Sequence, residues 1–223
     1  MAERFSEHLR RVADPIWEAQ HAHPFVRGIG NGTLDLEKFA FWVRQDYLFL
    51  IEYSRLFGLA AARAPDLETM GRFADLLQAM LRTEMELHRG YAAQFGISLD
   101  DLEREQPAPT TRGYTDFLLR VATTGDFAEL AAALLPCMWG FSEVGQRLAQ
   151  AERPVDPRYV AWIDMYADPE FATLAEWCRG LVDRLADGAS KDARRRMEDA
   201  FVTSSRYELA FWRMAWSMER WPV

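Results

Sequence analysis

The sequence predicts an all-helical protein. Apolar residues recur at steps of three and four through almost the whole chain, and no stretch alternates strictly between apolar and polar residues as a half-buried strand does. Hydrophobic residues make up 49% of the 223 positions and aromatic residues 13%, which is enough apolar area to offset the chain entropy lost on folding. We expect a multi-helix bundle with an internal pocket.

The helices expected in the first half of the chain are separated by prolines and glycines. The first covers residues 5–22, with Pro15 marking a kink or a restart, and the segment HPFVRGIGNGT after it is expected to be a loop. A second helix runs from about Leu36 to Arg63. A third of similar length ends at Gly96, because glycine favours the C-terminus of a helix.

The second half begins with the acidic segment SLDDLEREQPAPTTRG, which is expected to form a short helix and a loop. Residues 106–109 are the best candidate for a linker, but they are few, and no repeat of fixed period occurs. We therefore expect a single domain over residues 1–223. Five further helices are expected near residues 114–123, 127–150, 157–166, 169–186 and 192–216.

The charge of the chain disfavours binding to nucleic acid or to an anionic membrane. Lys and Arg number 26 against 34 Asp and Glu, so the formal net charge is -8 at pH 7 and the average surface repels phosphates. The densest basic run, Arg194 to Arg196, lies among acidic residues and is interpreted as a solvated helix face. No apolar run is expected to reach the roughly 18 uninterrupted residues of a membrane-spanning helix.

Two features indicate a cytoplasmic protein. The start MAERFSEHLRR lacks the apolar core of a secretory signal, and two cysteines are too few for the disulfide framework of a small secreted domain. One of them, Cys178, lies in LAEWCRGLVDRL without an unusual neighbour and is interpreted as a packing residue.

The other cysteine, Cys137, directly follows Pro136 inside the apolar run LLPCMWGFSEVG. A proline within a helix has no N–H to donate and crowds the carbonyl group four residues earlier, so we expect a kink that costs on the order of 3 kcal/mol. Such a distortion is tolerated more readily where it aims a side chain or opens a pocket. A functional and a packing interpretation of Cys137 therefore stand about level.

Two acidic residues stand among aromatic ones. Asp46 lies in FWVRQDYLFLIEYSR, where steps of three and four align it with aromatic residues on one helix face. It is either an exposed residue at the edge of this face, which base rates favour, or a buried carboxylate that needs a partner. Glu208 lies in FVTSSRYELAFWRMAW in a similar setting. A thiol and two such carboxyls would supply a nucleophile, a proton shuttle and an anchor for a flat polar ring.

The histidines indicate no metal site. Glu84 and His88 stand four apart, and a structural hydrogen bond or a surface pair explains them. Helical di-iron proteins use Glu-x-x-His pairs, whereas Met85 stands three before His88 here. His21 and His23 lie in HAHPF, where a haem ligand is conceivable but the end of a helix before a proline is the simpler interpretation.

Six segments, in chain order, closely resemble the TenA family, which is also called thiaminase II or the TENA/THI-4 family. They are HPFVRGIGNGTL, FWVRQDY, EMELH, LLPCMWGFSEVG, WIDMYADPEF and FVTSSRYELAFW. The resemblance implies a haem-oxygenase-like fold and a homotetramer without metal or cofactor. It also implies an enzyme of thiamin salvage that hydrolyses 4-amino-5-aminomethyl-2-methylpyrimidine to the 5-hydroxymethyl pyrimidine and ammonia, and that cleaves thiamin similarly.

The resemblance assigns roles to individual residues. It makes Cys137 the nucleophile, Glu208 the glutamate that moves protons to and from a ring nitrogen, and Asp46 the anchor of the amino-pyrimidine edge. Family members often have tyrosine in place of Phe49 and Phe141, and the two missing hydroxyls affect substrate preference because discrimination built on hydrogen bonds is large. The aromatic walls of the family pocket correspond to Phe49, Tyr53, Tyr114, Phe141, Tyr166 and Phe211.

Two other functions stay open. An enzyme with the same fold could act on a different small aromatic amine. It could also share the chemistry of the haem-oxygenase or pyrroloquinoline-quinone-synthase relatives, although no haem or metal constellation supports that chemistry. Some TenA-like proteins have been labelled transcriptional regulators, but DNA binding requires a basic face and a recognition helix, and this chain is acidic. The hydrolase is the preferred interpretation.

Overall fold

The structure is a computed structural model that describes residues 3–222, except for the side chains of Thr83, Glu84 and Leu87. Helices account for 82% of the chain, and no strand occurs between residues 3 and 222. The predicted all-helical class is therefore confirmed.

The chain forms two compact units. Unit 1 comprises residues 1–34 and 128–213, and unit 2 comprises residues 35–127 and 214–223. Neither unit is a continuous segment, because the chain leaves unit 1 to build unit 2, returns, and ends in unit 2. The single domain expected from the sequence covers both units and stays a prediction.

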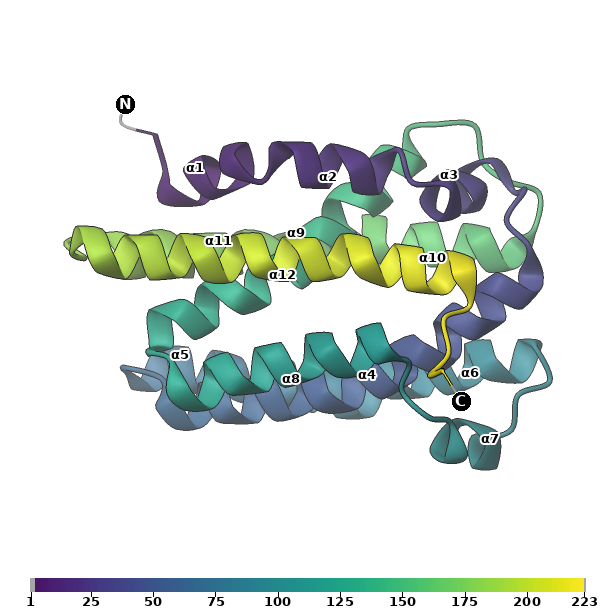
Figure 1. Ribbon diagram of the computed structural model, residues 1–223, viewed down its shortest axis with the longest axis horizontal. Coiled ribbons are helices and arrows are strands. Elements are labelled where there is room, and N and C mark those ends of the chain that lie inside the picture. Colours follow the sequence, from purple (N-terminus) through teal and green to yellow (C-terminus); the bar gives the residue numbers. More distant parts are fainter. Residues whose placement is uncertain (1–2, 223) are drawn as a thin grey trace. The chain divides into compact units, whose positions relative to one another are not determined.

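The helices of unit 1 mostly have the bounds that the sequence predicts. The long helix expected first is two helices, which confirms the restart near Pro15, a residue in the first turn of the second one. The first of them, α1 (Phe5–Val12), packs on α11 (Pro169–Ala186). Figure 1 shows α1 and α2 (Asp14–His21) following each other in one line. Unit 1 contains α1 (Phe5–Val12), α2 (Asp14–His21), α3 (Pro24–Asn31), α10 (Pro157–Ala167), α11 (Pro169–Ala186) and most of α9 (Phe127–Ala149) and α12 (Lys191–Ser217).

The loop expected for HPFVRGIGNGT is wrong, because this segment forms α3. His23 caps the helix, and its Nδ1 accepts a hydrogen bond from the backbone N–H of Phe25 at 3.2 Å. Gly28 packs closely on the chain that follows, since a Cβ there would lie 3.0 Å from Cβ of Leu34. Gly32, with a φ of 73°, ends the helix in the left-handed conformation. The glycines that suggested a loop therefore serve packing and termination.

Unit 2 is organised around α4 (Leu36–Arg63), whose bounds match the prediction. Asp35 caps this helix by accepting a hydrogen bond from the N–H of Glu37 at 2.7 Å. α4 packs along α5 (Leu67–Ala79) and α8 (Pro109–Thr124), and Figure 1 shows α8 beside it.

The third expected helix contains a π-helical turn that the sequence does not predict. α5 leads into η1 (Met80–Glu84) and then α6 (Met85–Gln94), so the helix continues through one wider turn. Gly96 follows with a φ of 69°, as a residue that ends a helix should. The short helix expected next is α7 (Leu99–Arg104), which Ser98 caps.

The linker candidate, residues 106–109, is fixed to α4 by a buried glutamine. Gln45 is 0% exposed, and its Nε2 donates to the carbonyl oxygen of Gln106 at 3.1 Å. Its Oε1 accepts hydrogen bonds from the N–H of Ala108 and the hydroxyl of Thr111, both at 2.8 Å. The segment is therefore not a flexible linker.

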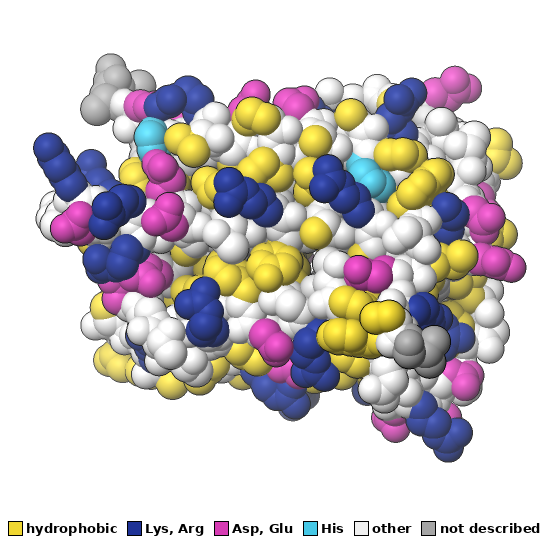
Figure 2. All heavy atoms as spheres, viewed as in Figure 1, with side chains coloured by type: hydrophobic (Ala, Val, Ile, Leu, Met, Phe, Trp, Pro, Cys, Tyr) yellow, Lys and Arg dark blue, Asp and Glu magenta, His cyan; other side chains and the backbone are white. Residues whose placement is uncertain are grey.

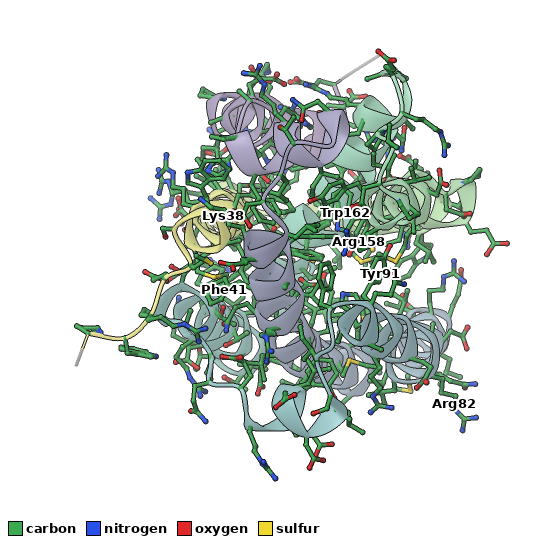
Figure 3. All side chains as sticks on the ribbon, turned by 90° about the vertical axis from the view of Figure 1, so that its right-hand side faces the viewer. Lys38, Phe41, Arg82, Tyr91, Arg158 and Trp162 are labelled. Carbon is green, nitrogen blue, oxygen red and sulfur yellow. The ribbon has the colours of Figure 1, made fainter. Side chains whose placement is uncertain are left out.

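The C-terminal residues also hold this part of unit 2. The indole of Trp221 donates to the carbonyl oxygen of Pro107 at 2.9 Å, next to the segment that Gln45 binds. Lys38 and Phe41, labelled in Figure 3, lie near the start of α4 beside the C-terminal segment. Lys38 donates to the carbonyl oxygen of Trp216 at 2.7 Å, and Arg220 lies 4.8 Å from the ring centre of Phe41.

Helix α9 agrees with the expectation that no uncharged run reaches about 18 residues, because its longest one covers residues 130–142. It contains an 18-residue window that is long and apolar enough to cross a membrane by length and composition. Its charged residues, Glu129, Glu143 and Arg147, lie toward its two ends, which leaves the middle apolar. Because 72% of the window is buried inside the structure, α9 fits a core helix of a folded protein.

Replacing Gln45 with leucine should lower the free energy of unfolding by at least about 2 kcal/mol, because the buried groups at 106, 108 and 111 lose their partner. Urea denaturation measures the loss, and Gln78→Leu, an exposed glutamine on α5, is the control. Equal losses in the two variants would contradict the assigned role of Gln45.

Candidate active site

The nine side chains to which the sequence analysis assigns a role are distributed over both units. Eight of them are buried, whereas Cys137 is partly exposed. Unit 1 holds Cys137, Phe141, Tyr166, Glu208 and Phe211, and unit 2 holds Asp46, Phe49, Tyr53 and Tyr114.

Asp46 is buried and hydrogen-bonded, so the exposed interpretation of this residue is wrong. Its side chain is on α4, and Oδ2 lies 2.6 Å from Nε2 of His88 on α6. The two residues are 4% and 1% exposed. A buried carboxylate needs such a partner because its removal from water costs several kcal/mol.

For His88, one of the two interpretations from the sequence is correct and the other is wrong. It forms a structural hydrogen bond, as one interpretation held, but it is not on the surface, and the side chain of Glu84 lies outside the described residues. The available signal was its spacing: Met85, His88 and Ala92 are three and four residues apart, and all are buried. A histidine on a buried face requires a polar partner.

The aromatic side chains of unit 2 form a cluster one turn beyond Asp46. Phe49 stacks on Tyr53 with ring centres 5.4 Å apart and an interplanar angle of 24°. The ring of Tyr114, on α8, lies 5.0 Å from that of Phe49. The predicted face of α4 thus presents a carboxylate followed by aromatic rings, with α8 adding a third ring.

In unit 1, two contacts join α9 to α12. Arg196 donates a hydrogen bond to Glu129, and the rings of Trp212 and Phe141 lie 5.2 Å apart. Residue numbers increase in the same direction along both helices from the first contact to the second, so α9 and α12 run parallel.

Cys137 and Glu208 lie in the turns of α9 and α12 that precede the contact between Phe141 and Trp212. Each lies four residues, or about one turn, before the ring contact: Cys137 precedes Phe141 on α9, and Glu208 precedes Trp212 on α12. Residues four apart share a helix face, so the thiol and the carboxyl belong to the faces that the ring contact joins. Glu208 is 3% exposed.

Further aromatic rings in unit 1 pack around the contact between Phe141 and Trp212. Phe141 lies 4.9 Å from Tyr166 and 6.2 Å from Trp162, ring centre to ring centre. Trp162, labelled in Figure 3, lies 6.3 Å from Trp212. Phe211 is 4% exposed on α12. The predicted wall residues of unit 1 are therefore buried in an aromatic environment.

The two cysteines differ as expected, and both are thiols. Cys178 is 1% exposed on α11, which confirms its packing interpretation. Cys137 is partly exposed in the middle of α9. The helix is unbroken from Phe127 to Ala149, so Pro136 does not end it, and the expected kink stays a prediction.

Among the described residues, Glu18, His21 and Glu143 are the group that could hold a metal ion. Two guanidinium groups already bind their carboxylates. Arg10 donates to Glu143 at 2.9 Å, and Arg147 donates to Glu18 at 2.8 Å and to Glu143 at 2.9 Å. This positive charge makes the cluster a salt-bridge network that ties α1 and α2 to α9.

Within this network, burial raises the pKa of Glu143, but hydrogen bonds from His21 and Arg10 outweigh that effect and lower the pKa to about 2. The ionised carboxylate therefore stabilises the fold fully above the unfolded pKa of about 4.5, and this stabilisation is lost as the pH falls toward 2.

The comparisons with known proteins show similarity along nearly the whole chain. The TENA/THI-4/PQQC family matches residues 10–218. A protein of Halalkalibacterium halodurans named aminopyrimidine aminohydrolase is 45% identical over 97% of each chain. A Bacillus subtilis protein of the same name is 39% identical over 98% of this chain and 92% of its own.

Solved structures show the same fold. A Silicibacter protein described as a TenA family transcription regulator has a TM-score of 0.89, is 31% identical, and matches over 95% of this chain and 96% of its own. A Shewanella denitrificans domain described as having a heme oxygenase-like fold has a TM-score of 0.74 at 12% identity, over 95% of this chain and 91% of its own. The expected haem-oxygenase-like fold is therefore confirmed.

Removal of the His88 side chain should strongly destabilise the folded protein. We expect His88→Ala to lower the free energy of unfolding by about 3–5 kcal/mol, because it leaves the buried carboxylate of Asp46 without its donor. His88→Gln keeps an N–H donor and should recover part of the loss. Urea denaturation of both variants measures the difference, and two equally small losses would refute this account.

Glu143→Gln should destabilise the protein by about 3 kcal/mol at pH 7, because the pKa falls from 4.5 to about 2 and each unit corresponds to about 1.4 kcal/mol. The difference from the wild type should shrink between about pH 4.5 and pH 2, where Glu143 itself becomes protonated. Thermal unfolding across this range tests the expectation against Glu152→Gln, an exposed position. A difference independent of pH would show that the charge of Glu143 is not responsible.

Proposed function

Because this chain belongs to the TENA/THI-4/PQQC family, we propose that it is an aminopyrimidine aminohydrolase, a hydrolase of thiamin salvage that acts on a carbon–nitrogen bond. The observation that carries the proposal is the 45% identity, over 97% of both chains, to a protein with that name. The proposed substrate is 4-amino-5-aminomethyl-2-methylpyrimidine. In the proposed reaction, a hydroxyl from water replaces the amino group of its aminomethyl substituent, and ammonia is released. Thiamin is a second proposed substrate.

The proposed mechanism uses three side chains. The thiolate of Cys137 adds to the electron-poor pyrimidine ring, and Glu208 delivers a proton to a ring nitrogen. The carbon–nitrogen bond then breaks, ammonia leaves, and water adds to the exocyclic carbon. Glu208 recovers its proton from the ring nitrogen as the bond to sulfur breaks. The position of Cys137 and Glu208 one turn before the contact between Phe141 and Trp212 supports this pairing.

Asp46 is proposed to accept a hydrogen bond from the amino-pyrimidine edge. The hydrogen bond from His88 engages Oδ2 and holds the carboxylate in one orientation, so that Oδ1 serves the substrate. A pre-oriented carboxylate loses little side-chain entropy when the ring binds.

The aromatic walls explain why substrate preference is a separate question from reaction class. Phe49 and Phe141 stand where relatives often have tyrosine, yet each keeps a neighbouring tyrosine ring: Tyr114 at 5.0 Å and Tyr166 at 4.9 Å. The apolar faces that stack on a pyrimidine are preserved, while two hydroxyls are absent. A different small aromatic amine is therefore the alternative substrate.

The setting of the enzyme is also proposed. We infer a cytoplasmic homotetramer without a nucleic-acid or membrane partner. The net charge of -8 supports the lack of a nucleic-acid or membrane partner, and on the face shown in Figure 2 the Lys and Arg side chains are scattered among Asp and Glu. The reaction as proposed needs only a thiolate, a carboxyl group and water. A regulatory role, which the description of the Silicibacter relative carries, is the second candidate, and the acidic surface disfavours DNA binding.

Replacing the proposed nucleophile should abolish turnover. We expect Cys137→Ala to reduce kcat for the aminomethyl pyrimidine by roughly 10³-fold or more, because no other thiol takes its place. Cys178→Ala, the other cysteine, should retain activity. Chromatography of the hydroxymethyl pyrimidine measures both, with thiamin as a parallel substrate.

This assay tests the proposed activity and the proposed nucleophile separately. A folded wild type that turns over neither substrate would refute the aminohydrolase. An active Cys137→Ala would leave the activity standing and refute the nucleophile.

A further inference from the structure

Gly145 lies on α9, the helix that carries the proposed nucleophile, and it makes a close backbone contact like that of Gly28 on α3. A Cβ added at Gly145 would lie 2.4 Å from the carbonyl carbon of Tyr166, 2.7 Å from its Cβ and 2.7 Å from the backbone nitrogen of Ala167. All three are backbone atoms or attached directly to the backbone, so no side-chain rotation relieves the overlap. The end of α10 therefore rests directly on α9 at Gly145.

The residue held at this contact is a proposed wall of the site. Tyr166 is in the last turn of α10, and its ring lies 4.9 Å from Phe141 on α9 and 4.6 Å from Trp162 on its own helix. Figure 3 labels Trp162. Gly145 thus sets the backbone of Tyr166, and Phe141 sets the position of its ring.

The spacing on α9 connects this contact with the chemistry. Cys137, Phe141 and Gly145 are four residues apart and share one helix face. One face of α9 therefore carries the thiol, a ring that packs on Tyr166 and the glycine on which Tyr166 is seated.

We propose that Gly145 is a positioning residue for substrate. It sets how far Tyr166 lies from the thiol of Cys137, and hence how tightly a flat aminopyrimidine ring is held beside that thiol. A side chain at position 145 moves the end of α10 away from α9 and displaces Tyr166. This inference rests on the proposed aminohydrolase activity, and it assigns to Gly145 a part in ring binding that its lack of a side chain conceals.

The test compares two alanines on the same helix. Gly145→Ala should raise KM for the aminomethyl pyrimidine by roughly 10-fold or more, because a displaced Tyr166 weakens binding of the ring in the ground state and the transition state alike, and it should change kcat less. Gly140→Ala is the matched control, since its added Cβ would meet only the edge of Trp17 at 4.0 Å, an ordinary contact. Both variants gain the same intrinsic helix propensity of about 1 kcal/mol.

A double-mutant cycle separates positioning from general destabilisation. If Gly145 acts through Tyr166, then Gly145→Ala should raise KM much less when Tyr166 is already alanine. Additive effects on KM would show that the glycine acts independently of Tyr166, and would overturn the proposal.

Further outcomes are equally decisive. With an active wild type, equal KM values for Gly145→Ala and Gly140→Ala overturn the role of Gly145 and leave the proposed function intact. Absence of wild-type turnover refutes the proposed function itself and the inference with it. Should Gly145→Ala fail to fold, Ala167→Gly loosens the same end of α10 without adding an atom, and it should also raise KM. An unchanged KM in that variant overturns the proposal.

Discussion

The packing of Phe141 against Trp212 is the contact on which the chemistry proposed for unit 1 depends. Neither ring needs to react. Their contact fixes which turn of α9 faces which turn of α12, and the preceding turn of each helix then carries the thiol or the carboxyl. A rigid helix is well suited to this task, because a side chain one turn away inherits its position from the contact with little freedom to drift.

Much of the fold is predictable from the sequence because helices of this length carry many repeats of their apolar pattern. The bounds of α4 and α11 follow from that pattern and from the residues that cap them. α3 does not, since its glycines are usual in loops, and the close approaches of Leu34 to Gly28 and of Leu148 to Gly30 explain why they occur in a helix here. The wide turn η1 also has no signal in composition, because a π-helical turn depends on packing around it.

Some residues of the candidate site can be identified from the sequence, and others cannot. Residue types and spacing single out Cys137, Asp46 and Glu208, since a proline beside a cysteine and acids among aromatic residues are unusual local patterns. The partner of Asp46 is 42 residues away in the sequence, and no local pattern connects it with His88. Gly145 is harder still to identify from sequence, because its contribution lies in the atoms that it lacks.

Unit 1 is built from two segments of the chain, residues 1–34 and 128–213, which the ribosome makes at different times. The indole of Trp17 donates to the hydroxyl of Ser205, which the ribosome adds 188 residues later. The first helices therefore emerge from the exit tunnel long before the chain that buries them exists, and all of unit 2 except its last residues is made in the interval. Contacts so distant in sequence form slowly, so the nascent N-terminal segment exposes the apolar surface around Trp17 for most of translation and is a natural client for chaperones.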